Sequence, residues 1–223
     1  MCLLSLCHEK GNKEMIVSYN LKGVGDTLLL VLADSKGQEV EAIRKGDVSC
    51  VSVKETKEIV AWNIFQASHK ITNLNGEGQI NLSPSQLTEL NLAVKEAGFD
   101  TEFTLDNSPK FVVGLVTECK KHEDSDHLSV TKILVDNDEE LQIVCGASNI
   151  REGLKVVVAK VGAMMPDGMI IWPGELRGVK SDGMVCSARE LNLPNAPEVK
   201  GILELPDTYE VGSTFNLSLS VNE

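Results

Sequence analysis

Hydrophobic and polar positions alternate in short stretches over the first third of the chain, which is the pattern of half-buried β-strands. Residues 15–19 form the first such stretch. An apolar run over 27–33 ends in a turn sequence at 34–37 (Asp-Ser-Lys-Gly), and a second run follows over 38–44. Two runs separated by turn formers predict a β-hairpin. Further strands are predicted at residues 47–54 and 58–65.

The pattern becomes helical after residue 82. Ser83 is placed to cap a helix with Pro84 in its first turn, and Gln86 completes a capping box. Apolar residues then recur at intervals of three and four, which places them on one helical face: Leu87, Leu90, Val94 and Ala97. Gly98 ends the helix. Residues 15–105 therefore predict a small α+β domain, and its function is unknown.

A cluster of turn formers at residues 106–109 separates this domain from a region with a different pattern. There, short apolar runs alternate with polar or glycine-bearing connections, and this spacing predicts a small closed β-barrel. The predicted strands are residues 111–117, 128–135, 141–145, 156–160, 184–187 and 202–205. We therefore expect an α+β N-terminal domain followed by an all-β barrel domain over residues 106–216.

Both ends of the chain are expected to lie outside these domains. Residues 1–14 are predicted to be an extension and residues 217–223 a tail. The apolar start lacks the positively charged region and the length of a signal peptide. Because Met15 opens the first credible strand, we expect it to be the true start, which the intact mass of the natively expressed protein would test.

The charge of the chain is the main compositional constraint. Its 223 residues include 21 Lys and Arg against 33 Asp and Glu, which gives a formal net charge of −12. A protein this acidic is repelled by nucleic acids and anionic membranes unless one face is locally basic. No apolar run reaches the ~20 residues that span a bilayer, so no membrane association is expected.

The cysteines suggest a reducing compartment. The chain has six of them and no Cys-x-x-Cys pair. This usage predicts reduced thiols in a cytoplasmic protein and argues against a structural zinc site.

Two local features offer reactive side chains. His122-Glu123-Asp124-Ser125-Asp126-His127 could ligate a metal, but it lies between two predicted strands, where a polar loop needs no function. We expect no metal there and expect Asp126 to accept hydrogen bonds from loop amides. Cys145 could act as a nucleophile with a histidine as base, but a buried structural thiol is the favoured interpretation. No cofactor is predicted.

Positive charge is concentrated in one part of the barrel region. Residues 141–189 carry six cations against four acids, whereas residues 118–140 carry three against eight. Within the first stretch, Arg177 and Lys180 lie on a loop whose glycines allow a ligand to approach the backbone closely, so they could contact phosphate. A solvated turn is the alternative.

Residues from about 111 to 215 closely resemble the tRNA-binding domain of bacterial phenylalanyl-tRNA synthetase β subunits. The matching strings, in order, are Phe111-Val112-Val113-Gly114, Gln142-Ile143-Val144-Cys145-Gly146-Ala147 with Asn149-Ile150, Leu176-Arg177-Gly178-Val179, Gly183-Met184 with Cys186-Ser187, and Gly201-Ile202-Leu203-Glu204-Leu205. The family usually has proline and a basic residue where this chain has Glu123 and His127. The layout of the whole chain resembles the YtpR-type tRNA-binding proteins of bacteria.

This resemblance implies an OB-fold barrel that binds tRNA by shape and backbone without catalysis. The RNA-binding residues that we predict on this basis are Asn149, Arg151, Lys155, Lys160, Arg177, Lys180, Ser181 and Ser187. Two alternatives remain. One is a dimeric, chaperone-like module that uses the apolar run at residues 164–172, and the other is a hydrolase acting through Cys145 or the His122–His127 cluster. A homodimer is possible.

Overall fold

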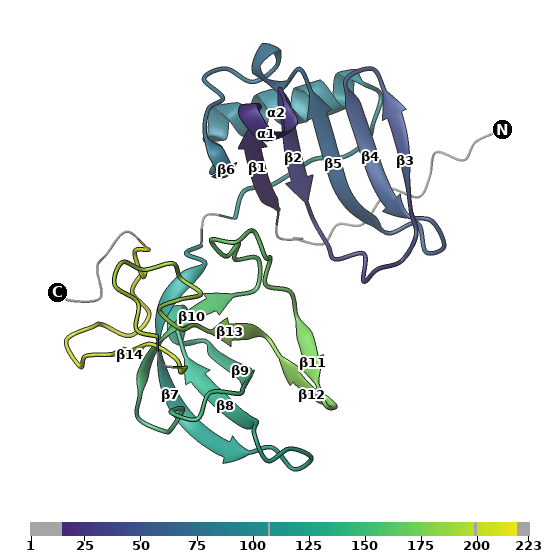
Figure 1. Cartoon of the computed structure of the whole chain (residues 1–223). Coiled ribbons are helices and arrows are strands. Elements are labelled where there is room, and N and C mark those ends of the chain that lie inside the picture. The colour runs from purple at the N-terminus through teal and green to yellow at the C-terminus, as the bar shows by residue number, and fades with distance from the viewer. Residues whose placement is uncertain (1–14, 107, 199, 218–223) are drawn as a thin grey trace. The chain divides into compact units, whose positions relative to one another are not determined.

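The computed structural model describes residues 15–106, 108–198 and 200–217 (Figure 1). The chain divides into two compact units, Met1–Asn107 and Ser108–Glu223. The predicted extension, residues 1–14, lies outside the described residues, as does nearly all of the predicted tail. The expected fold class, an α+β unit followed by an all-β barrel, is confirmed.

The first unit is built on one six-stranded antiparallel sheet with the strand order β3-β4-β5-β2-β1-β6. Its strands are β1 (Ile16–Asn20), β2 (Thr27–Val31), β3 (Val40–Lys45), β4 (Val48–Val53), β5 (Ile59–Phe65) and β6 (Glu77–Gln79). Two short helical elements, α1 (Leu21–Val24) and the 3₁₀ turn η1 (Ala67–His69), and one longer helix, α2 (Pro84–Glu96), accompany them.

The predicted hairpin between residues 27–33 and 38–44 is wrong. The turn at 34–37 exists, and the Asp34 side chain accepts a hydrogen bond from the Lys36 amide at 2.8 Å. However, β2 pairs with β1 and β5, whereas β3 pairs only with β4 at the sheet edge. Leu28 and Leu30 are fully buried, so the more apolar β2 takes a central position and β3 is left exposed at the edge.

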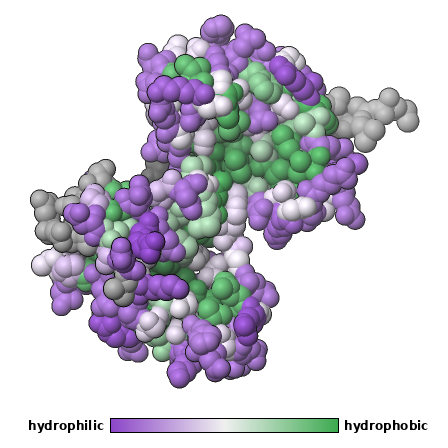
Figure 2. Space-filling view, in the orientation of Figure 1, coloured by the Kyte–Doolittle hydropathy of each residue, from purple (hydrophilic) through white to green (hydrophobic). Residues whose placement is uncertain are grey.

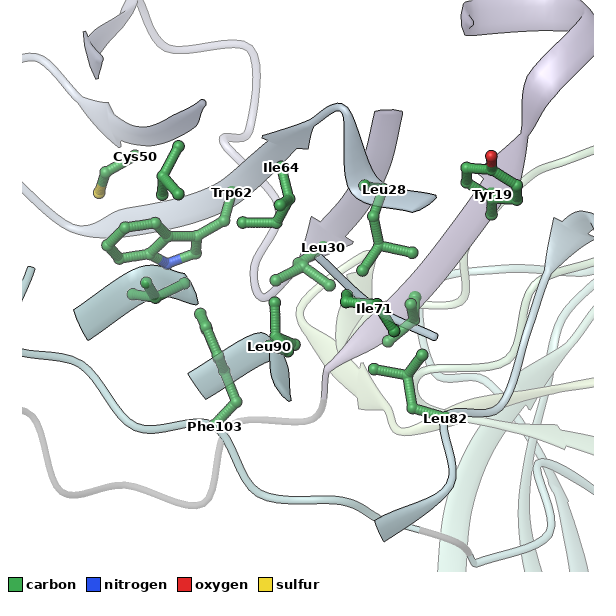
Figure 3. Close-up of a cluster of buried hydrophobic side chains, with 14 residues drawn as sticks. Tyr19, Leu28, Leu30, Cys50, Trp62, Ile64, Ile71, Leu82, Leu90 and Phe103 are labelled. Atoms are coloured by element: carbon green, nitrogen blue, oxygen red, sulfur yellow. The ribbon is translucent and has the colours of Figure 1, made fainter. Parts of the chain in front are cut away.

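Helix α2 covers one face of this sheet, and its predicted capping box is confirmed. The Ser83 hydroxyl accepts from the Gln86 amide, and the Gln86 side chain accepts from the Ser83 amide at 2.9 Å. Leu90 from α2 packs with Trp62 from β5 and with Phe103 in one core (Figure 3). The Trp62 ring meets Phe99 and Phe103 edge to face, with centroids 4.9 and 5.8 Å apart.

The opposite face of the sheet is also apolar but only partly buried. Leu29 and Val31 of β2 point to this face, because they alternate with the buried Leu28 and Leu30. Phe65 lies there too, and the Arg44 guanidinium stacks over its ring at 4.0 Å. Figure 2 shows hydrophobic residues gathered on the visible face of this unit.

The second unit is a barrel whose main sheet has the strand order β13-β10-β7-β8-β9. Its strands are β7 (Phe111–Lys121), β8 (Ser129–Leu134), β9 (Glu140–Cys145), β10 (Lys155–Lys160), β13 (Gly183–Val185) and β14 (Glu204–Leu205), and the 3₁₀ turn η2 (Asp136–Asp138) precedes β9. Two bonds join β9 to the segment before β13 and close the barrel. The Asp182 amide donates to the Gln142 carbonyl at 2.9 Å, and the Val144 amide donates to the Ser181 hydroxyl at 3.1 Å.

Strands β7 and β10 are buried on both faces. Val112 and Val158 point into the barrel, whereas Val113 and Val157 contribute to a second core under the C-terminal segments. Gly114 fits where these strands approach β8, because a Cβ atom there would lie 2.5 Å from the Ile133 side chain. Residues Val156–Ala159 of β10 are apolar at every position, which is typical of strands that are buried on both faces.

One hairpin of the barrel was not predicted. Strands β11 (Gly174–Leu176) and β12 (Val179–Ser181) pair through a two-residue turn made by Arg177 and Gly178, with φ of 47° and 81°. Positive φ at both positions is typical of a tight hairpin turn. The sequence predicts a loop here, and arginine stands at the first turn position, where Asn, Asp or Gly is usual.

Candidate nucleic-acid interface

The tip of the β11–β12 hairpin carries two of the predicted RNA-binding cations. Arg177 Nη1 donates to the Asp124 carbonyl at 2.7 Å, which fastens the hairpin to the loop between β7 and β8. Its charge has no carboxylate partner among the described residues. The Lys180 side chain makes no hydrogen bond or ion pair within the described part of the chain. Both side chains are exposed, so both positive charges face solvent.

The histidine-rich loop has a structural role at this point. His122 is 4 % exposed, and its Nδ1 accepts from the Asp124 amide at 3.0 Å. Its Nε2 lies 3.2 Å from the Leu176 carbonyl and therefore donates to it. The loop amides thus donate to His122 Nδ1 and, from His127 at 3.3 Å, to the Ser125 hydroxyl, and not to Asp126 as expected. No three metal-ligating side chains gather anywhere in the described residues.

Two predicted RNA-binding residues, Asn149 and Arg151, hold the loop after β9 against the C-terminal segment. The Asn149 amide group bonds both the amide and the carbonyl of Ile202, at 3.0 and 3.1 Å. Arg151 forms a bidentate ion pair with Glu204 at 2.9 and 3.1 Å. Hydrogen bonds from Arg151, and secondarily from Asn149, lower the pKa of Glu204. Gly201 has to be glycine here, because a Cβ would lie 2.8 Å from Asn149 Oδ1.

The two predicted lysines of β10 are also engaged within the barrel. Lys155 Nζ donates to the carbonyls of Asp207 and Tyr209, both at 2.7 Å. Lys160 Nζ pairs with the Asp136 carboxylate at 2.9 Å, and the side chains of this pair are only 14 % and 10 % exposed. Both lysines therefore connect β10 to neighbouring segments.

The two predicted serines are bound to main-chain or carboxylate groups. Ser181 is 5 % exposed and its hydroxyl accepts from the Val144 amide, in the bond that closes the barrel. The Ser187 amide and hydroxyl both donate to Glu190 Oε2 at 2.7 Å, as at a helix N-terminus. Of the eight predicted residues, Arg177 and Lys180 thus lie exposed on the β11–β12 hairpin, where Arg177 keeps its bond to the Asp124 carbonyl, and the other six bond within the barrel.

Two further cations, Arg189 and Lys200, were missed as site residues. Both are exposed, and neither bonds to another described residue. They line a groove of about 480 Å³ in the barrel wall, beyond the point where β9 and β13 separate. Arg189 lies two residues after Ser187 of the sequence motif, but nothing there signals its meeting with Lys200. That meeting depends on β14, which brings residues 200–202 back against the loop after β9.

The alternative of a cysteine nucleophile finds no support in the geometry. Cys145 is 7 % exposed, and burial raises the pKa of its thiol, which disfavours the reactive thiolate. His122, a candidate base, already uses both ring nitrogens. The second buried thiol of this region, Cys186, has its pKa raised to about 12 by burial.

The apolar run at residues 164–172 forms a corner of the barrel. Met165 and Ile171 are buried in the outer core, and Met164 bridges to Ile170. Met169 is 47 % exposed. The run therefore packs mainly within the unit. Separately, no helix among the described residues has the length and hydrophobicity needed to cross a membrane.

Known proteins resemble both units. A family model described as "Putative tRNA binding domain" matches residues 111–214, and a domain of unknown function (DUF4479) matches residues 35–106. The phenylalanine–tRNA ligase β subunit of Idiomarina loihiensis is 44% identical over 138 residues, which cover 60% of this chain and 17% of that subunit. The β subunit of Sulfurimonas denitrificans is 49% identical over 106 residues, covering 46% and 13%.

A third relative matches along nearly the whole chain. It is the protein of Bacillus subtilis named "Putative tRNA-binding protein YtpR", which is 48% identical over 197 residues. The match covers 88% of this chain and 97% of the relative, so it includes both units. The chain belongs to the YtpR family.

Proposed function

We propose that this protein binds tRNA through its second unit, without catalysis, in the cytoplasm. The observation that carries the proposal is the coincidence of the tRNA-binding family match over residues 111–214 with four exposed cations that have no carboxylate partner in the described residues. The matching relatives are named for tRNA binding or tRNA ligation. Binding without catalysis is favoured because Cys145 and His122 are both held in structural roles.

The four cations form a path along one side of the barrel. Arg177 and Lys180 lie at its start, where the Gln142 side chain donates to the Lys180 carbonyl at 2.9 Å. Strand β9 then runs from Gln142 to the groove, whose lining includes Val144–Ala147 together with Arg189 and Lys200. The five residue steps from Gln142 to Ala147 span at most roughly 17 Å. This length fits contacts with several successive phosphates of one RNA backbone.

The path also accounts for RNA binding by an acidic protein. The second unit carries 11 cations against 18 acids. Several of its other cations are neutralised, since Lys120, Lys132 and Lys160 each pair with a carboxylate. The exposed cations of the path therefore stay available to an RNA backbone, as does Lys121, which is exposed and has no ion pair among the described residues. We expect weak binding that depends strongly on salt, because counterion release supplies most of the affinity.

The test is a titration of fluorescently labelled total tRNA, followed by anisotropy at several salt concentrations. With four phosphate contacts, log K should fall with log salt with a slope of about −3 to −4. Replacing Arg177 and Lys180 by Ala should make this slope less steep by about 2. The matched control replaces Lys120 and Lys132, which are already paired, and should keep the native slope. Affinity that does not depend on salt, or no tRNA binding, would contradict the proposal.

A further inference from the structure

The groove between β9 and β13 has an apolar floor. The groove begins beyond the hydrogen bond between the Val144 amide and the Ser181 hydroxyl, which is one of the two bonds that close the barrel. Cys145, Val185 and Ile202 are each less than 9 % exposed and form its base, and Met184 lies half-buried beside them. The raised pKa of the Cys145 thiol keeps this floor uncharged at neutral pH. A volume of about 480 Å³ falls in the range of pockets that bind small ligands.

The rim of the groove is positively charged. Arg189 and Lys200 both line it, and neither has a partner among the described residues. A smaller hollow of about 260 Å³ shares both cations with the groove. The acid at the rim, Glu190, already accepts two hydrogen bonds from Ser187 at 2.7 Å. An anion at the rim would therefore meet two cations and a carboxylate that is already hydrogen-bonded.

We infer that this groove binds one nucleoside monophosphate unit, with its base on the apolar floor and its phosphate at Arg189 and Lys200. A planar aromatic base packs well on aliphatic side chains, and the Met184 thioether makes favourable contacts with aromatic rings. Cations held without an acid partner suit a phosphate. The same chemistry is offered by a free nucleotide and by an unpaired nucleotide of an RNA.

The position of the groove favours the unpaired nucleotide, and this part of the inference rests on the proposed tRNA binding. The groove lies at the end of the path that starts at Arg177 and Lys180. An RNA backbone that follows β9 would reach the groove within one strand length. A base that leaves the helical stack there would enter the groove, whereas a paired base would not fit.

The first test uses AMP with the isotope-labelled full chain and follows amide signals by NMR. AMP should shift the signals of Gly146, Ala147 and Gly201, which line the groove. Adenosine should shift the same signals but bind about tenfold more weakly, because it lacks the phosphate. Replacing Arg189 and Lys200 by Ala should remove this difference. If AMP at millimolar concentration leaves these signals unchanged, the inference is wrong.

The second test separates the two sources of the nucleotide. An RNA hairpin with one unpaired 3′ nucleotide should bind about tenfold more tightly than the blunt hairpin, and the Arg189→Ala, Lys200→Ala protein should bind both equally. The control with Lys120 and Lys132 replaced should keep the preference. Equal binding of both hairpins, with AMP shifts present, assigns the groove to free nucleotides. If the protein binds tRNA but AMP causes no shifts, the groove is not a nucleotide site and the proposed function stands. If AMP causes shifts but tRNA does not bind, the groove is a nucleotide site and the proposed function is wrong.

Discussion

The two units are both antiparallel sheets, but they treat their charged side chains differently. In the described part of the first unit, four cations pair with acids, as in Lys54–Glu39 and Lys57–Glu41 at 2.9 and 2.7 Å, and Arg44 and Lys45 lie over the rings of Phe65 and Phe99. In the second unit, six candidate binding residues bond within the barrel, whereas Arg177, Lys180, Arg189 and Lys200 are exposed and have no carboxylate partner among the described residues. We therefore expect the location of the unpaired cations, more than the net charge, to decide where an RNA backbone binds.

The units also bury their apolar side chains differently. The first unit has one core between the sheet and α2, while the other sheet face stays partly exposed. The second unit has two cores, one inside the barrel and one outside β7 and β10. Because each core lies within one unit, a substitution in one core is expected to perturb that unit alone.

Replacing Trp62 by Ala should break the first unit and spare the second. Trp62 is fully buried and meets two phenylalanine rings, so the free energy of unfolding of the first unit should fall by about 3–5 kcal/mol. Calorimetry should show one transition shifted to lower temperature, with AMP-induced NMR shifts retained. Trp62→Phe is the control. Its free energy of unfolding should fall less than that of Trp62→Ala, because the indole Nε1 that it removes has no hydrogen-bond partner among the described residues. Loss of nucleotide binding in Trp62→Ala would show that the units depend on each other.

Replacing Lys160 by Met should destabilise the second unit instead of weakening RNA contacts. It leaves the carboxylate of Asp136 in a nearly buried place without its main partner, which costs about 2–3 kcal/mol. Urea unfolding should show this loss in the transition of the second unit. Under conditions where the variant is folded, its salt slope for tRNA should equal the native one. A slope reduced by about 1 would instead make Lys160 a phosphate contact, as the sequence predicted.

The second unit should lose stability at alkaline pH because of Cys186. Burial raises the pKa of this thiol to about 12, whereas an unfolded thiol titrates near 8.5. The folded state keeps its proton while the unfolded chain loses it, so stability is complete below about pH 8.5 and falls as pH rises towards 12. The slope is up to about 1.4 kcal/mol per pH unit. Urea midpoints from pH 8 to 11 should fall less steeply for Cys186→Ala, and parallel curves would contradict this role.

The smallest effect is expected from Glu204. Its pKa is lowered by Arg151 and Asn149, so its contribution is present above the ordinary carboxyl pKa and disappears as pH falls through the lowered value. The pair is exposed, so solvent screens most of it. Glu204→Gln should lower the urea midpoint of the second unit slightly at pH 7 and by less at pH 3. An equal difference at both pH values would contradict a charge-based role.

Sequence reasoning succeeded where one local rule decides the structure. The helix at 84–96 follows from Ser83, Pro84 and the spacing of its apolar residues, and β10 follows from the four consecutive apolar residues Val156–Ala159. It failed where distant segments compete. The partner of β2 is decided by burial of Leu28 and Leu30 in the sheet centre, which no turn sequence encodes. The pairing of Arg151 with Glu204 spans 53 residues in the same way.

The position of β10 has a consequence for synthesis of the protein. This strand pairs with β7 before it in the chain but also with β13 and β14, which end 45 residues later at Leu205. At 5–20 residues per second, the ribosome needs roughly 2–9 s to make the chain between Lys160 and Leu205. During that time, the apolar residues Val156–Ala159 lack two of their partner strands. The first unit, complete by residue 107, can fold in the meantime, so the nascent second unit is the part of this protein that is most exposed to aggregation and to chaperones.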